Sequence, residues 1–245
     1  NAQIQPTQQG EVAIENSGDV GTDAAPVGVF YVGTSTDTDN AFSLNNAGSI
    51  TGEVTVLGVG GATNINNSGL LAEGVFVSVQ GPATLTSSGQ IDSSGSQAVY
   101  LASRTSSDIV LDVDVGTAAT ATEDSDLRDV YAQSQFLTSL PATSETETVD
   151  GVTTTTTTSG FTRVGGTGSA AIGEDANTGS IEVIALEGAA IINNGSVGSE
   201  TEFDYLFASS NTQEGSTVTV SSTDGTDSSF TRTQTNTAIG STASI

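Results

Sequence analysis

The sequence has no cysteine, no histidine and no lysine, and it also lacks tryptophan and methionine. Without cysteine it has no thiolate metal site, no disulfide and no cysteine nucleophile. Without histidine, a Ser-His-Asp triad and a histidine-ligated zinc site are excluded. Without lysine, a Walker lysine and Schiff-base chemistry are excluded as well. We therefore expect the protein not to be an enzyme.

Positive charge is also scarce. The sequence has 29 acidic residues and four basic ones, all arginine, so that its net charge is −25. Such a charge repels nucleic acid phosphates and anionic membrane surfaces, and it suits a saline exterior or the binding of divalent cations. No apolar run approaches the roughly 18 residues of a transmembrane helix. We expect no nucleic-acid partner and no membrane insertion. The arginines are Arg104, Arg128, Arg163 and Arg232.

Aromatic residues make up only 5 % of the chain, whereas aliphatic residues are plentiful. A compact globule usually needs larger side chains in its core. A narrow solenoid core filled by valine, isoleucine, leucine and alanine does not. The composition therefore favours a solenoid.

A short phrase repeats along the chain, and it is clearest at Leu44–Ile50, Ile65–Leu71 and Leu85–Ile91. Each copy has an apolar residue, a polar residue, Asn or Ser, a small residue, Gly, any residue and an aliphatic residue. The phrase glycines are spaced 21 and 20 residues apart, and strand-like segments run between the copies. A fixed period of about 20 residues with short strands and glycine turns is typical of a solenoid. The glycines are Gly48, Gly69 and Gly89.

Each position of the phrase has a physical reason in a β-solenoid, where every strand pairs with its copy in the next repeat. The aliphatic residues that flank the phrase are expected to point inward and to stack on their counterparts. The Asn before each glycine can bond to the turn backbone and to the Asn of the next repeat. The glycine fits a corner that requires positive φ or a close backbone approach.

These patterns predict an all-β protein, a parallel β-helix (β-solenoid) with one inserted arm. Residues 1–10 are expected to be a frayed end or a strand that docks on another subunit. The first part of the solenoid is expected over 11–116, the arm over 117–172, and the last part, with a C-terminal hairpin at Asp224-Gly225, over 173–245.

The arm is expected to contain one short helix and one β-hairpin. Leu127, Val130, Tyr131 and Ser134 follow helical spacing, which predicts a helix over Asp124–Leu137. Asp150-Gly151 lies between two β-prone runs, which predicts a hairpin. The threonines at 153–158 leave a glycosylated or disordered tract open as the alternative.

The repeat phrases IENSGDV, NNAGSITG, NINNSGLL and AIINNGSV resemble the Asn-Ser-Gly-x-Ile repeats of autotransporter passengers and related haemagglutinin-like surface adhesins of Gram-negative bacteria. The resemblance covers residues 11–116 and 173–207. It implies a secreted, right-handed parallel β-helix at the surface of a bacterium, with a role in adhesion or surface structure. Autotransporters carry a C-terminal membrane barrel, and no segment here looks like one. We therefore expect a released passenger or a small secreted subunit that assembles with itself.

Clustered acidic residues in three turns are candidates for structural Ca²⁺ binding, because carboxylate oxygens are the ligands that Ca²⁺ prefers. Solvated acidic loops are the alternative. A carboxylate pair, Asp112 and Asp114, is predicted about 7 Å apart on one strand face, within the range that glycoside hydrolysis uses. We interpret this pair as a solvated strand face. The candidate Ca²⁺ ligands are Asp37, Asp39, Asp124, Asp126, Asp224 and Asp227.

The sequence supports two hypotheses for function. The first is a secreted structural protein that assembles with itself, by strand addition or end-to-end stacking, into an extracellular filament or surface layer. The second is a monomeric adhesin or passenger fragment. A polysaccharide-cleaving β-helix enzyme is a remote third alternative.

Overall fold

A computed structural model describes most of the 245 residues of the chain. Backbone is described for residues 2–4, 10–33, 37–94, 97–111, 129–139, 143–149, 152–158, 161–174, 176–197, 206–210, 217–223, 229–231, 233–236 and 241–244. Side chains are described for residues 10–33, 37–94, 97–111, 129–136, 138, 164–174, 176, 178–195 and 206–210.

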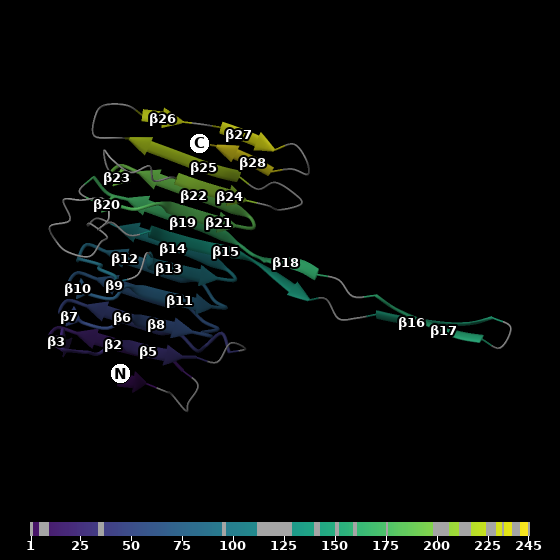
Figure 1. Ribbon diagram of the computed structural model, residues 1–245, viewed down its shortest axis with the longest axis horizontal. Coiled ribbons are helices and arrows are strands. Elements are labelled where there is room, and N and C mark those ends of the chain that lie inside the picture. The colour runs from purple at the N-terminus through teal and green to yellow at the C-terminus, as the bar shows by residue number, and fades with distance from the viewer. Residues whose placement is uncertain are drawn as a thin grey trace.

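The described residues are all-β, without a helix, and they form two long sheets (Figure 1). In the first, sheet A, every neighbouring pair along the strand order is parallel. Its strands are β1 (Ala2–Ile4), β5 (Val29–Val32), β8 (Val54–Leu57), β11 (Val75–Val79), β13 (Gln97–Ser103), β15 (Asp129–Ser139), β21 (Ile181–Ala185) and β24 (Leu206–Ser210).

The second long sheet, sheet B, is parallel from β2 through β25 to β28, and two antiparallel strands follow at its last edge. Its parallel strands are β2 (Val12–Asn16), β6 (Phe42–Asn46), β9 (Thr63–Asn67), β12 (Ala83–Ser87), β14 (Ser106–Leu111), β19 (Thr167–Ile172), β22 (Gly188–Asn193), β25 (Thr217–Thr223) and β28 (Ser241–Ser244). The antiparallel strands are β26 (Ser229–Thr231), paired with β25, and β27 (Thr233–Asn236), paired with β28.

Short strands form two smaller sheets beside the long ones. Two of their parallel pairs join the residues after a phrase glycine to the same residues of the next repeat, and a third joins Asn177–Thr178 to Ser196–Val197. In most of the described repeats the chain passes from sheet B through a short strand to sheet A and then back to sheet B, so that such a repeat supplies one strand to each long sheet. This arrangement fits a β-solenoid. The short strands are β3 (Asp19–Thr22), β4 (Ala25–Pro26), β7 (Ser49–Ile50), β10 (Leu70–Leu71), β20 (Asn177–Thr178) and β23 (Ser196–Val197).

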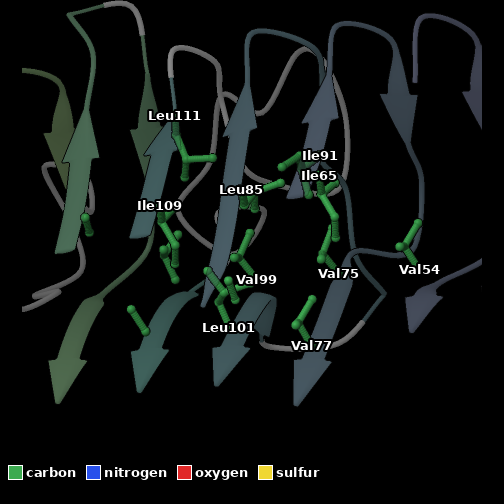
Figure 2. Close-up of a cluster of buried hydrophobic side chains, with 14 of the residues drawn as sticks. Val54, Ile65, Val75, Val77, Leu85, Ile91, Val99, Leu101, Ile109 and Leu111 are labelled. Carbon is green, nitrogen blue, oxygen red and sulfur yellow. The ribbon is translucent and has the colours of Figure 1, made fainter. Parts of the chain in front are cut away.

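The core lies between the sheets, and its side chains come from alternate strand positions (Figure 2). Strand β9, for example, alternates buried and exposed residues along its whole length. The aliphatic residues at both ends of the three clearest phrase copies are fully buried, which confirms the predicted inward orientation. In sheet B they stack strand by strand in one register column that contains Leu44, Ile65, Leu85, Ile109, Ala170 and Ile191.

A ladder of inward-facing amides runs beside this aliphatic column, as the phrase predicts. The Nδ2 atom of Asn16 donates to Oδ1 of Asn46 over 2.7 Å, and Asn46 donates to Asn67 over 2.7 Å. Asn67 donates to Oγ of Ser87 over 2.9 Å. The same amides bond to the turn backbone, since Nδ2 of Asn46 also donates to the carbonyl of Gly48 over 3.2 Å. The ladder therefore both joins consecutive repeats and holds the backbone of the turn that follows each strand.

Close backbone approach explains the phrase glycines, and positive φ does not, because neither Gly48 nor Gly69 has it. A Cβ on Gly69 would overlap the carbonyl oxygen of Gly48, and a Cβ on Gly48 would overlap that of Gly18. Stacked corners of this kind leave no room for a side chain.

The helix predicted over Asp124–Leu137 is wrong for the part that is described. Residues Asp129–Ser139 form β15, and residues 124–128 lie outside the described part. Val130 and Ala132 alternate into the core, and β15 pairs in parallel with β13 on one side and β21 on the other. Burial and two ladders of backbone hydrogen bonds outweigh the local helical spacing.

The arm begins after Ser134, where β15 leaves sheet A and pairs antiparallel with β18 (Phe161–Gly165). Strands β16 (Thr143–Val149) and β17 (Val152–Thr158), which flank Asp150-Gly151, also pair antiparallel and extend away from the sheets (Figure 1). Within the stretch 117–172, the first half of β15 and all of β19 pair with the long sheets instead. The runs on both sides of Asp224-Gly225 likewise pair antiparallel.

Strand β1, in the N-terminal segment, pairs with β5 of the same chain. In the part of the chain that the structure describes, there is no helix with the length and apolar character needed to span a bilayer.

Candidate functional site

A column of side chains runs across the outer face of sheet A at one register position. It lies between buried neighbours, since Val75 and Val77 point into the core on either side of Phe76. The parallel pairing places one residue of each strand in this column, from β5 to β24. Its members are Phe30, Thr55, Phe76, Tyr100, Tyr131, Glu182 and Phe207.

Three of these side chains form a continuous aromatic stack. The ring centroids of Phe76 and Tyr100 are 4.8 Å apart with an interplanar angle of 8°. Those of Tyr100 and Tyr131 are 5.2 Å apart at 10°. The spacing follows the separation of neighbouring strands, about 4.8 Å. Each such contact stabilises the fold by about 0.5–1.5 kcal/mol beyond its buried area.

The stack ends at Phe76, because the next strand, β8, carries Thr55 at the same position. Both faces of the Tyr100 ring are covered by neighbouring rings, whereas Phe76 has a ring on one side only and is 36 % exposed. Thr55 therefore interrupts what is otherwise a run of rings from Phe30 to Tyr131.

Two hollows open at this interruption. The first, of about 410 Å³, lies over Thr55, and the second, of about 500 Å³, lies beside it toward the short-strand corner. Glu53 and Phe76 line both, so the two hollows are adjacent, and we call them together the Phe76 groove. The first is lined by Gly28, Val29, Phe30, Glu53, Thr55 and Phe76. The second includes Glu73, Ser94, Gln97 and Tyr100.

Two carboxylates border the groove. Oε2 of Glu53 accepts a hydrogen bond from Oγ1 of Thr55 over 2.7 Å. Oε2 of Glu73 accepts from Oγ of Ser94 over 2.6 Å and from its backbone N–H over 3.3 Å. Both carboxylates are thus held by hydroxyl donors. Arg104, the arginine whose side chain is described, bonds to Thr138 and lies over the ring of Phe136 instead.

Burial changes the acidity of the groups in and near the groove. Burial in the stack, with smaller contributions from the Glu182 carboxylate and from Tyr100, raises the pKa of Tyr131 to about 12. Burial also raises the pKa of Tyr100, whose hydroxyl donates to Oε1 of Gln133 over 3.1 Å. Burial raises the pKa of Asp92 as well, against the lowering effect of its hydrogen bond from Gln90 and with a further rise from Glu73.

Another hollow, of about 400 Å³, follows the outer edge of the amide ladder on sheet B. Here Oε1 of Glu15 accepts from Nδ2 of Asn45 over 2.6 Å, and Oδ1 of Asn45 accepts from Nδ2 of Asn66 over 2.8 Å. These exposed amides bond to one another. Their arrangement strengthens the repeat and leaves the Phe76 groove as the better candidate site.

Of the predicted Ca²⁺ ligands, Asp37 and Asp39 lie within the described residues, and they share one turn. Oδ1 of Asp37 accepts a hydrogen bond from the backbone N–H of Asp39 over 3.0 Å, so this carboxylate closes its own turn. No group of three or more acidic side chains that could hold a metal ion occurs among the described residues. The remaining candidates lie outside the described residues: Asp124, Asp126, Asp224 and Asp227, and so do Asp112 and Asp114 of the carboxylate pair.

Sequence reasoning missed the aromatic column. The signal was present, because Phe76 and Tyr100 each lie between inward-facing residues of strand-like segments. The column positions are, however, 24 and 31 residues apart from Phe76 to Tyr131, so no fixed period relates them. Only the strand register shows that they stack.

Comparisons of the chain with protein-family models, with curated proteins and with solved structures give no match.

Proposed function

We propose that the chain is a parallel β-helix, and that it is a secreted structural subunit that assembles end to end into an extracellular filament or surface layer at a bacterial surface. The observation that carries the proposal is the pair of long sheets, in which strand after strand keeps a parallel register. A strand edge at one end has the direction and spacing needed to pair with the strand at the other end.

The outer edges of sheet A support this proposal. Within the described residues, sheet A ends at β1 on one side and at β24 on the other, and neither has a further strand partner there. Unpaired edges of this kind recruit another chain. A head-to-tail contact that does not close into a ring produces a helical filament. Strand β24 of one copy would then pair with the first strands of the next.

Electron microscopy of negatively stained protein over a concentration series tests this proposal. Long fibres or sheets of constant width are expected. The variant Ala208→Lys places a charge on the core-facing side of β24, where Ala208 packs partly buried against the core. An inward-pointing charge on an edge strand blocks pairing with another chain, so isolated rods are expected.

The matched control is Ser209→Lys, one residue further along β24. Successive side chains of a strand point to opposite faces, so this control adds the same charge without placing it between stacked ends, and its fibres should match those of the unaltered chain. Circular dichroism spectra of both variants show whether the monomer fold is kept. Isolated rods of the unaltered chain at every concentration would contradict end-to-end assembly. Fibres of Ala208→Lys with unchanged length would show that β24 does not form the junction.

A second candidate function is a monomeric adhesin or passenger rod, and the Phe76 groove is the observation that favours it. A hollow with an exposed ring and two carboxylates on a rigid sheet can hold a ligand. If the microscopy shows rods alone, this second function takes the place of the first.

A further inference from the structure

The Phe76 groove has the geometry of a gap in an aromatic stack. Phe30 and Phe76 lie on strands that flank β8, and both line the hollow over Thr55. Two strand spacings separate their backbones by about 10 Å. The ring of Phe76 is stacked on the Tyr100 side and open on the Thr55 side. The hollow is therefore about two ring spacings wide, with aromatic side chains at both ends.

The charge around this gap determines whether it favours a cationic or an anionic ligand. Glu53 lines both parts of the groove and Glu73 lines the second part, while the whole chain carries a net charge of −25. The described Arg104 is engaged with Thr138 and Phe136. Anionic ligands are repelled, and a cation gains from both carboxylates. The open face of an aromatic ring also carries partial negative charge and attracts cations.

We propose that the Phe76 groove binds an organic cation of the quaternary ammonium type, such as the trimethylammonium group of choline. A nitrogen at the middle of the gap lies about 5 Å from the ring positions on either side, within the range of about 6 Å for a cation–π contact. The methyl groups of such a cation fill an apolar hollow that a hydrated metal ion does not fill. Glu53 and Glu73 supply the countercharge. This inference is independent of end-to-end assembly.

Titration with choline chloride, followed by NMR shifts of the aromatic ring protons, tests the proposal, with sodium chloride at the same ionic strength as the reference. We expect saturable binding with a Kd of about 1–10 mM. Raising the salt concentration should weaken it, because the site is partly exposed. The uncharged isostere 3,3-dimethylbutanol should bind weakly or not at all.

Three variants locate the site. Phe76→Ala removes the open ring and should weaken choline binding by about 3- to 30-fold. Thr55→Phe fills the gap with a ring and should abolish binding while the fold is kept. Phe207→Ala is the matched control, because it removes an exposed ring at the same register position of sheet A, far from the groove, and should leave the Kd unchanged.

Three results would overturn the proposal. These are the absence of saturable shifts with choline, equal losses for Phe76→Ala and Phe207→Ala, and equal affinity for choline and its uncharged isostere. Sedimentation with phosphatidylcholine vesicles distinguishes the sources of the group. Binding to vesicles that is lost in Phe76→Ala indicates a lipid headgroup, and binding of free choline alone indicates a soluble or polymer-linked cation.

Discussion

The buried amide ladder leads to a sharp prediction for Asn67→Ala. The side chain of Asn67 is 3 % exposed. Its oxygen accepts from Nδ2 of Asn46, and its nitrogen donates to Ser87 and to the carbonyl of Gln90. The side chain also donates to the carbonyl of Gly69 and accepts from the Gly69 N–H, each over 3.3 Å. Truncation therefore removes five bonds and leaves a small cavity at the corner between consecutive repeats.

The expected loss follows from the partners that remain. Each buried hydrogen bond contributes about 0.5–1.5 kcal/mol net, and more when a partner is left unsatisfied. Asn46 still donates to the carbonyls of Gly48 and Leu70, and Ser87 still donates to Gly89. Because the partners keep other bonds, we expect a total loss of about 2–4 kcal/mol in the free energy of unfolding.

Urea denaturation followed by circular dichroism measures this loss. The matched control is Asn66→Ala, which makes the same substitution one residue earlier on β9, where the side chain is exposed and bonds to Asn45 over 2.8 Å. The control should change the free energy of unfolding by less than about 0.5 kcal/mol. Equal losses for the two variants would refute the account of an inner ladder that holds the repeats together.

Three further predictions concern packing and pH. Gly69→Ala should destabilise the fold by about 1–3 kcal/mol or more, because the new Cβ meets the carbonyl of Gly48. Gly18→Ala is the control: its Cβ would meet nothing within 4 Å, so it should be nearly neutral in the same urea assay. Leu85→Ala, at a fully buried position, should cost about 2–5 kcal/mol, and a midpoint equal to that of the unaltered chain would contradict the core assignment. Tyr131, with its pKa raised to about 12, should be the last described tyrosine to ionise in an absorbance titration. Since the unfolded side chain ionises near 10.0, its stabilising contribution is complete below about pH 10 and declines as the pH rises toward about 12. Glu182→Gln should lower the pKa of Tyr131. If Tyr131 ionised together with the other tyrosines, the result would contradict its burial in the aromatic stack.

The repeat phrase was enough to predict the sheets and corners. Its aliphatic residues are buried, its Asn side chains bond from repeat to repeat, and its glycines lie where backbones touch. These features depend on a residue and its copy about 20 positions away, which is information that a sequence contains directly. The sequence predicted either positive φ or a close backbone approach at these glycines, and the structure shows the close approach at Gly48 and Gly69.

The features that were missed depend on register between irregularly spaced strands. Tyr131 and Val130 fit a helical spacing, and the pairing of β15 with β13 and β21 is what makes them a strand. The same pairing brings Tyr131 onto Tyr100. A register shift of one residue would turn the ring into the core. The Phe76 groove could therefore not be predicted from local pattern.

The most direct test of the proposed parallel β-helix is a pair of engineered disulfides, because the sequence has no native cysteine. Asn45 and Asn66 are in register on β6 and β9, so their Cα atoms are about 4.8 Å apart, within the range that a disulfide bridges. Asn45 and Asn64 lie on the same two strands but two residues out of register, about 8 Å apart. Asn45→Cys/Asn66→Cys should close an intramolecular disulfide under mild oxidation, seen by mass spectrometry, and Asn45→Cys/Asn64→Cys should not. Closure of the second pair in place of the first would contradict the register on which the whole fold depends.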